Sequence, residues 1–413
     1  MISLLKNCLL SDNRKVDILI QDNIILKISE TPITQEELSL PIDQVFDIKK
    51  NLVMPGIIDG YGRCKTNSSY DQSNYNTEST ACAYGGITTF VDIPTVPYAT
   101  SYIDELKNKI EDASKNSIVN FAFAVSASDA IDDRELISVQ NYVVGTILTL
   151  NSRDFKERIN DSESLKKKIR CSKMVILHLS GADIDVFFDI CDSKEVKILF
   201  YDITNENDLD KINYYKNELG FNVKTATSIM YLLFNRDQIN DEYKKKTLTT
   251  EYKLGTMLNN INLWNAIKNG AIDMITSSHI PVSLIEKFET EKLGIPNFET
   301  LFSMLFDNCY FKRIPITILE RLLCKNPAKI YGIKNKGEIK EGYDADLIII
   351  NTTKRWWIKN EDIVSYARWT PFNDYRISGR VMMTFVNGEL VYNFINQIAP
   401  IRKVKSSKMV RFQ

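Results

Sequence analysis

Histidine is the scarcest chemically informative residue in this sequence. The 413 residues include two histidines, His178 and His279. A catalytic zinc site usually takes about three protein ligands, and histidine is a common choice. The shortage therefore argues against an ordinary histidine-based metal centre.

Several other features are absent as well. No run of about 18 apolar residues predicts a membrane span, and no small-residue cleavage site follows the N-terminus as in a signal peptide. The seven cysteines are scattered without a CxxC pair, which is typical of reduced thiols in the cytosol. The formal net charge of −1 creates no bulk attraction for polyanions. We therefore expect a cytoplasmic protein that binds neither nucleic acid nor membrane.

From residue 52 the sequence alternates between short β-rich runs and longer polar segments with helical spacing. Several polar segments begin with Ser, Thr, Asp or Asn and end at glycine, as helices do. Eight repeats predict an α/β fold, a (β/α)8 barrel of the TIM type. A doubly wound open sheet is the alternative, which the lack of a GxGxxG loop disfavours. The runs are 52–59, 87–94, 119–127, 142–150, 174–180, 196–203, 222–229 and 271–278.

Strand-like patterns also occupy both ends of the chain. The first 50 residues alternate around a Gln-Asp-Asn turn, and Asn387-Gly388 is a strong hairpin signal. We predict a discontinuous β-module of residues 1–50 and 336–400 that flanks a barrel of residues 51–335. Residues 401–413 form a basic C-terminal tail that we expect to be mobile.

Motifs along this framework resemble those of the dihydroorotases, a branch of the amidohydrolase superfamily. "MPGIIDGYGRCK" (54–65) resembles PG-x-ID-x-H-x-H-x-R, and "AYGGITTFVDIPTVP" (83–97) resembles A-x-GG-x-TT-x-x-DMPN-x-x-P. The resemblance runs nearly end to end and includes the hydantoinases as near relatives. It implies an amidohydrolase-type barrel with a flanking β-module. The later matching segments are "GAIDMITSSHIP", "GIPNFET", "NPAKIYG", "KGEIKEGYDADLIII" and "RWTPFNDYRISGRVMMTFVNGELVY".

The resemblance implies zinc-dependent interconversion of N-carbamoyl-aspartate and dihydroorotate. Zinc polarises the amide carbonyl and lowers the pKa of bound water towards ~7. The family takes its ligands from an H-x-H pair after strand 1, a carboxylated lysine at strand 4 and histidines after strands 5 and 6. An aspartate after strand 8 is both ligand and general base. All lie at the C-terminal rim of the barrel.

The first of these positions carry the wrong chemistry in this chain. The H-x-H pair falls on Tyr61 and Arg63, and a guanidinium stays protonated and has no lone pair to offer a metal. The lysine position falls on Ile147, so no carbamate can form there. We expect Arg63 to occupy part of the space that the metal would take.

The later positions are changed as well. The strand-6 histidine falls on Tyr201 or Asp202, and the strand-8 aspartate falls on Ser278, a poor ligand and no base at neutral pH. His178 falls after strand 5, where it is either a surviving ligand or, in our preferred interpretation, a structural histidine. With four or five of six positions altered, we predict no bound zinc and no other cofactor. The alternatives are metal-free acid/base chemistry and a relocated site at Asp59, Asp92 and His178.

The positions that would contact substrate also differ from the family pattern. The family arginine after the H-x-H pair falls on Lys65, the DMPN asparagine on Thr95 and the arginine of the NPPLR segment on Asn259. Losing that arginine weakens the case for an orotate-like anion. His279 could bind a substrate carboxylate, although we prefer a structural role. Together with His178, these four residues are our substrate-pocket candidates.

Three functional hypotheses follow from the resemblance and the altered site. The preferred one is a non-catalytic protein of pyrimidine biosynthesis that acts as a structural partner of aspartate transcarbamoylase, as degenerate dihydroorotases can. The second is an active, divergent cyclic amidohydrolase that converts N-carbamoyl-aspartate to dihydroorotate. The third is a scaffold resembling the inactive dihydropyrimidinase-like proteins. We expect a homo-oligomer or a hetero-oligomer.

Overall fold

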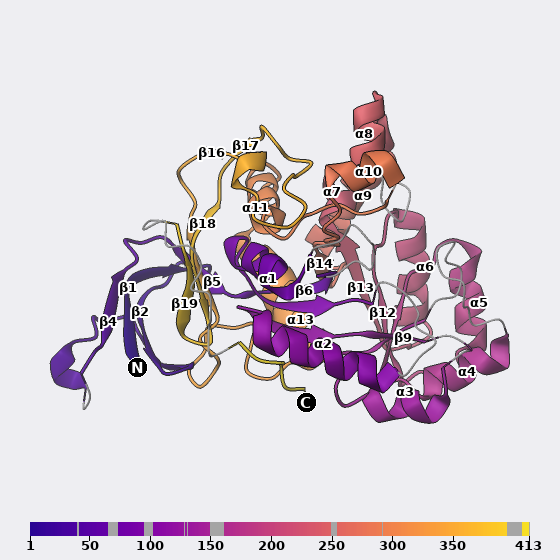
Figure 1. Cartoon of the computed structure of the whole chain (residues 1–413), viewed down its shortest axis with the longest axis horizontal. Helices are drawn as coiled ribbons and strands as arrows, with labels where there is room; N and C mark the ends of the chain where they lie inside the picture. Colours follow the sequence, from indigo (N-terminus) through magenta and orange to yellow (C-terminus); the bar gives the residue numbers. More distant parts are fainter. Residues whose placement is uncertain are drawn as a thin grey trace.

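The computed structural model combines a barrel of parallel strands with a β-sheet that lies beside it (Figure 1). This arrangement confirms the predicted α/β barrel and excludes an open doubly wound sheet. The structure describes residues 1–38, 41–64, 73–94, 102–127, 129, 131–148, 161–248, 254–290, 292–394 and 407–412.

The barrel has eight strand positions, because β8 and β9 together occupy one of them. Each position overlaps one of the eight predicted runs. Neighbouring strands pair in parallel along β6-β7-β8 and along β9 to β14, and Ala124 separates β8 from β9. A parallel bridge between Gly62 and His279 closes the ring. The strands are β6 (Ile57–Gly62), β7 (Ile87–Asp92), β8 (Asn120–Phe123), β9 (Val125–Ala127), β10 (Thr146–Leu148), β11 (Met174–Leu177), β12 (Lys197–Phe200), β13 (Val223–Ser228) and β14 (Met274–Thr276).

The first predicted run is divided between the two parts of the molecule. Residues Leu52–Pro55 form β5, which belongs to the sheet, whereas β6 belongs to the barrel. The chain passes between them at Gly56, where a Cβ atom would lie 2.1 Å from Oγ1 of Thr88. Gly56 in the segment "MPGIIDGYGRCK" therefore allows the backbone to pass close to the neighbouring strand.

Helices follow the barrel strands in sequence and surround them (Figure 1). Polar caps begin several of them, including Asn74, Asn205 and Thr256, and α9 ends at Gly270, whose φ is 77°. No helix in the described part of the chain has the length and apolar character needed to span a bilayer. The helices are α1 (Tyr75–Tyr84), α2 (Tyr102–Asn116), α3 (Asp133–Val139), α4 (Ser162–Arg170), α5 (Ala182–Ile190), α6 (Glu206–Asn217), α7 (Ile229–Leu233), α8 (Glu242–Thr247), α9 (Met257–Asn269), α10 (Leu284–Thr290), α11 (Leu301–Phe311), α12 (Ile316–Glu320), the π-helical η3 (Arg321–Lys325) and α13 (Asn326–Tyr331).

The sheet beside the barrel takes its strands from both ends of the chain. Its order is β19-β18-β15-β5-β1-β2-β3, with β4 paired to β1. A separate two-stranded ribbon of β16 (Trp356–Trp357) and β17 (Arg376–Ile377) lies nearby. The sheet strands are β1 (Ile2–Leu10), β2 (Lys15–Gln21), β3 (Ile24–Ser29), β4 (Gln44–Asp47), β5, β15 (Leu347–Asn351), β18 (Arg380–Val386) and β19 (Glu389–Asn393).

The C-terminal residues 407–412 pack against the barrel, so the expectation of a mobile tail is wrong for them. The backbone N–H of Val410 donates to the carbonyl of Phe121 at 3.0 Å, and that of Lys334 donates to the carbonyl of Arg411 at 3.0 Å. Val410 is 4% exposed and joins the apolar cluster inside the barrel. Apolar burial outweighs the basic composition of this segment.

Candidate active-site region

The positions that the resemblance assigns to zinc lie at the carboxyl ends of barrel strands. Barrel enzymes place their catalytic groups at this face. The structure thus brings these positions to one rim, although their side chains interact in ways that the sequence did not reveal. They are Tyr61 in β6, Ile147 in β10, His178 directly after β11, Asp202 shortly after β12 and Ser278 shortly after β14.

Two tyrosine rings meet across this rim. Tyr61 projects from β6 and Tyr201 follows β12, and their ring centroids lie 4.4 Å apart with 24° between the planes. β6 is adjacent to β7 and β14, whereas β12 pairs with β11 and β13, so the stack joins strands that are not neighbours. The rings therefore occupy space inside the barrel rather than on its wall.

The stacked rings belong to the apolar core of the barrel. Tyr61, Tyr201 and Ile147 are 2%, 7% and 9% exposed, and they share one cluster with Ile176 and Met274. A metal centre with its substrate needs polar donors and water at this level. Here the apolar packing of the interior extends to the rim.

Asp202 and Ser278 interact directly with each other. The Ser278 hydroxyl donates to Oδ1 of Asp202 at 2.7 Å. Both residues have positive φ, 51° for Asp202 and 46° for Ser278, which costs on the order of 1 kcal/mol or more for a residue with a side chain. The surrounding structure therefore holds these two strand-end residues in strained conformations, with the serine bonded to the carboxylate.

His178 and Arg63 are both shielded at this rim. Burial lowers the pKa of His178 to about 3, so its imidazole is neutral at physiological pH. Its ring centroid lies 5.8 Å from that of Tyr201. Arg63 is buried, and its charge lies close enough to Asp92 to act against the rise in pKa that burial imposes on that carboxyl. We expected Arg63 to fill part of the space that the metal would take. The side chains that meet across the barrel at this level are the rings of Tyr61 and Tyr201, and the expectation for Arg63 stays a prediction.

These side chains do not fit the zinc centre that the family implies. An aliphatic chain replaces the bridging lysine at Ile147, a guanidinium stands at Arg63, and the phenol of Tyr61 belongs to a ring stack. In the part of the chain that the structure describes, no three His, Cys, Asp or Glu side chains form a group that could hold a metal ion.

The relocated metal site that we considered is not assembled either. Asp59 accepts hydrogen bonds from the backbone N–H and the hydroxyl of Ser277, both at 2.7 Å. Asp92 accepts from the Tyr75 hydroxyl at 2.8 Å and from the Cys64 backbone at 3.1 Å. Both carboxylates hold elements of the barrel together through these hydrogen bonds, and they form no group with His178 among the described residues.

Three of the five substrate-pocket candidates lie among the described residues, His178, Asn259 and His279. Lys65 and Thr95 lie outside the described residues. Asn259 caps helix α9, because its Oδ1 accepts from the Thr256 backbone and hydroxyl at 2.8 Å each. This amide therefore stabilises a helix end rather than replacing the substrate-binding arginine.

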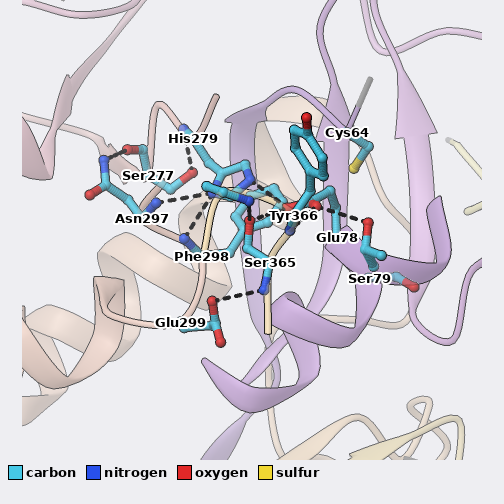
Figure 2. Close-up of polar contacts among 12 residues, drawn as sticks. Cys64, Glu78, Ser79, Ser277, His279, Asn297, Phe298, Glu299, Ser365 and Tyr366 are labelled. Atoms are coloured by element: carbon cyan, nitrogen blue, oxygen red, sulfur yellow. Dashed lines mark hydrogen bonds and ion pairs between the residues drawn. The ribbon is translucent and has the colours of Figure 1, made fainter. Parts of the chain in front are cut away.

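His279 is a structural residue in this geometry and is not available to a substrate (Figure 2). Its Nδ1 accepts from the backbone N–H groups of Asn297 at 3.0 Å and Phe298 at 3.2 Å. The proton must then be on Nε2, which donates to Oε2 of Glu78 at 2.9 Å. The ring also stacks on Phe298, with centroids 3.7 Å apart and 1° between the planes. Both nitrogens and one face are already in use.

Glu78 is a buried residue whose importance the sequence did not indicate. It is 0% exposed and also accepts from the Ser365 hydroxyl at 2.7 Å and the Tyr366 backbone at 2.9 Å. It therefore joins helix α1, the segment after β14 and the segment around 365 (Figure 2). One feature of the sequence could have indicated that Glu78 is buried: it is the lone carboxylate among the small and apolar residues of "TESTACAYGG".

Glu299 gives a testable pH dependence. It accepts from the Val364 backbone at 2.8 Å, and burial raises the pKa of its carboxyl to about 8. The folded state retains a proton that the unfolded state loses above its ordinary pKa near 4.5. Glu299 should therefore reduce stability as pH rises from about 4.5 to about 8. We expect Glu299→Gln to remove on the order of 2–4 kcal/mol of this loss, measured by urea unfolding across that pH range.

Glu341→Gln is the matched control for that measurement. Glu341 is an exposed glutamate that also accepts a backbone N–H, from Ile28 at 2.8 Å. Its replacement should leave the pH dependence unchanged. If the free energy of unfolding changed equally with pH in wild type and Glu299→Gln, the raised pKa of Glu299 would be contradicted.

Comparisons with known proteins agree with the motifs. Residues 238–391 match the model of the amidohydrolase family. The dihydroorotase of Methanosphaera stadtmanae is 27% identical over 421 residues, covering 94% of this chain and 95% of that protein. The dihydroorotase of Methanothermobacter thermautotrophicus is 24% identical over 412 residues, covering 94% and 93%. That of Pyrococcus horikoshii is 40% identical over 129 residues, covering 31% and 30%.

Solved structures show the same architecture. The D-hydantoinase from a Thermus species superimposes with a TM-score of 0.88 at 19% identity, covering 99% of both chains. The L-hydantoinase of Arthrobacter aurescens superimposes with a TM-score of 0.84 at 21% identity, covering 99% of both chains. This similarity concerns the fold, a barrel with a flanking sheet. The sequence relatives bear out the resemblance: the chain is dihydroorotase-like, and its residues 238–391 are similar to the amidohydrolase family.

Proposed function

We propose that this chain is a non-catalytic, cytoplasmic dihydroorotase-like protein of pyrimidine metabolism. The observation that carries the proposal is the Tyr61–Tyr201 stack, with centroids 4.4 Å apart, inside the rim where the family holds its metal. Apolar packing at this level leaves no donor set among the described residues to polarise an amide carbonyl or activate water. At the strand-8 position, where the family has its general base, this chain has Ser278, whose hydroxyl donates a hydrogen bond to Asp202.

Metal content and turnover test this proposal together. The purified chain should contain far less than one zinc ion per chain after incubation with zinc. It should show no cyclisation of N-carbamoyl-aspartate above the enzyme-free rate, because neither the electrophile nor the nucleophile is activated. The Methanosphaera stadtmanae dihydroorotase, assayed in parallel, serves as the positive control. About one bound zinc with turnover would overturn the proposal.

We further propose aspartate transcarbamoylase as the partner of this chain. The support is the contrast between a substituted rim and an intact framework, in which motifs such as NPAKIYG and DADL persist. Selection for binding, rather than for turnover, would leave that contrast. Co-expression with the transcarbamoylase of the same organism should yield one complex in gel filtration. Separate elution, with no effect on the partner's stability or activity, would contradict this assignment.

An active, divergent dihydroorotase is the second candidate. The observation in its favour is that the relatives matched over most of the chain are dihydroorotases, at 24–27% identity. Turnover in the cyclisation assay would support this active-enzyme alternative. A stable homo-oligomer without transcarbamoylase contact would instead favour the scaffold that resembles the dihydropyrimidinase-like proteins.

A further inference from the structure

A small cavity lies at the seam between the barrel and the sheet, away from the rim described above. Its walls come from the C-terminal end of α1, the start of α11, the β16 ribbon and strands β18 and β19. Figure 1 shows these elements meeting where the sheet approaches the barrel. The cavity volume is about 50 Å³, enough for a few water molecules or a small organic molecule.

Arg380 lines this cavity without an ion-pair partner among the described residues; the carboxylate of Asp362, which also lines the cavity, acts on it only from beyond ion-pair distance. Its guanidinium carbon lies 4.5 Å from the Trp356 ring centroid and 3.6 Å from that of Phe394. These rings cover the faces of the guanidinium, while its N–H groups point outward in its plane. No described residue forms a side-chain hydrogen bond or an ion pair with it, and burial lowers its pKa.

Trp356 supplies a second donor in the same place. Its Nε1 atom is buried and finds no acceptor among the described residues. A buried donor without an acceptor costs about 1–3 kcal/mol. Two residues that line this cavity therefore carry donors, one of them charged, that form no side-chain hydrogen bond with the described residues, Asp362 included.

We propose that the seam cavity binds a small monocarboxylate, of about acetate to propionate size, through the Arg380 guanidinium and the Trp356 indole N–H. A carboxylate supplies two acceptor oxygens and a negative charge within hydrogen-bond distance of the guanidinium, which the more distant Asp362 does not. The Tyr84 and Tyr392 rings, with centroids 4.3 Å apart, provide an apolar wall for the short hydrocarbon part. Glu299 also lines the cavity, and its raised pKa keeps it largely protonated at neutral pH, so it does not repel an anion.

Indole NMR of the ¹⁵N-tryptophan-labelled full chain tests this site. The four tryptophans give four indole signals, and Trp356→Phe identifies the relevant one. Titration with sodium acetate should shift that signal saturably, whereas sodium chloride and acetamide should not. Acetamide has nearly the same shape as acetate without its charge. Arg380→Gln should weaken acetate binding about tenfold or more, because a charge-assisted hydrogen bond is lost.

Arg376→Gln is the matched control. Arg376 lies over the exposed neighbouring ring, Trp357, with its guanidinium carbon 5.9 Å from the centroid. This variant should bind acetate like wild type. If Arg380→Gln does not fold, Trp356→Phe replaces it, and loss of the acetate-induced rise in melting temperature supports the site. A non-saturable acetate response, an equal response to acetamide, a response to phosphate alone, or unchanged binding in Arg380→Gln would overturn the proposal.

Discussion

Replacing Lys336 with methionine is expected to lower the free energy of unfolding by about 3–5 kcal/mol. Lys336 is 5% exposed, and its ammonium contacts Oδ2 of Asp346 at 2.5 Å and Oδ2 of Asp344 at 2.8 Å. Methionine matches the length of lysine but cannot neutralise the two carboxylates, which would remain shielded without a counter-charge. Urea unfolding at neutral pH measures the difference.

The size of this effect follows from the position of the ion pairs. Asp346 also accepts from Nδ2 of Asn120 in β8 at 3.3 Å and from the Asn387 backbone at 2.7 Å. The network therefore joins the barrel to the sheet through the aspartates of the DADL motif. A structural function explains why this motif persists in a chain with an altered rim.

Lys325→Met provides the control for the first prediction. Lys325 forms an exposed ion pair with Glu338 at 2.6 Å. Surface pairs contribute about 0–1 kcal/mol, so this variant should unfold nearly like wild type. Comparable losses in Lys325→Met and Lys336→Met would show that burial of the network does not determine its contribution.

Replacing His279 with alanine should also cost about 3–5 kcal/mol. The substitution leaves the backbone donors of Asn297 and Phe298 without their acceptor and deprives Glu78 of one donor. It also opens a cavity against the stacked ring of Phe298. Thermal and urea unfolding should report the loss, with no accompanying change in bound metal if the histidine is structural.

The other histidine of the chain provides the comparison. The His178 ring is shielded from water but its residue keeps some exposure at the rim, and its ring contact with Tyr201 is loose at 5.8 Å, so His178→Ala should cost less, about 1 kcal/mol. A double-mutant cycle of His279→Ala with Glu78→Gln should give a coupling energy of about 1–3 kcal/mol. Additive losses would mean that the 2.9 Å contact between the two side chains contributes little.

The predicted strand runs were accurate because side-chain alternation and turn residues act locally. The run at 52–59 was less accurate, because the sequence pattern is continuous across Pro55-Gly56 while the two halves join different sheets. The C-terminal segment was misjudged for a related reason. Its basic residues suggested solvent, and the burial of Val410 depends on a barrel end that sequence spacing does not reveal.

The alternation of strands and helices, and the lack of a good metal ligand at Arg63, Ile147 and Ser278, can be read from the amino-acid sequence alone. Both depend on residue type and local spacing, since donor atoms and periodicity are properties of the chain. The folded chain was needed to reveal that Tyr61 stacks on Tyr201, that His279 contacts Glu78 and that Arg380 shares a cavity with Trp356. These contacts join residues far apart in the chain, and barrel closure and side-chain packing alone bring them together.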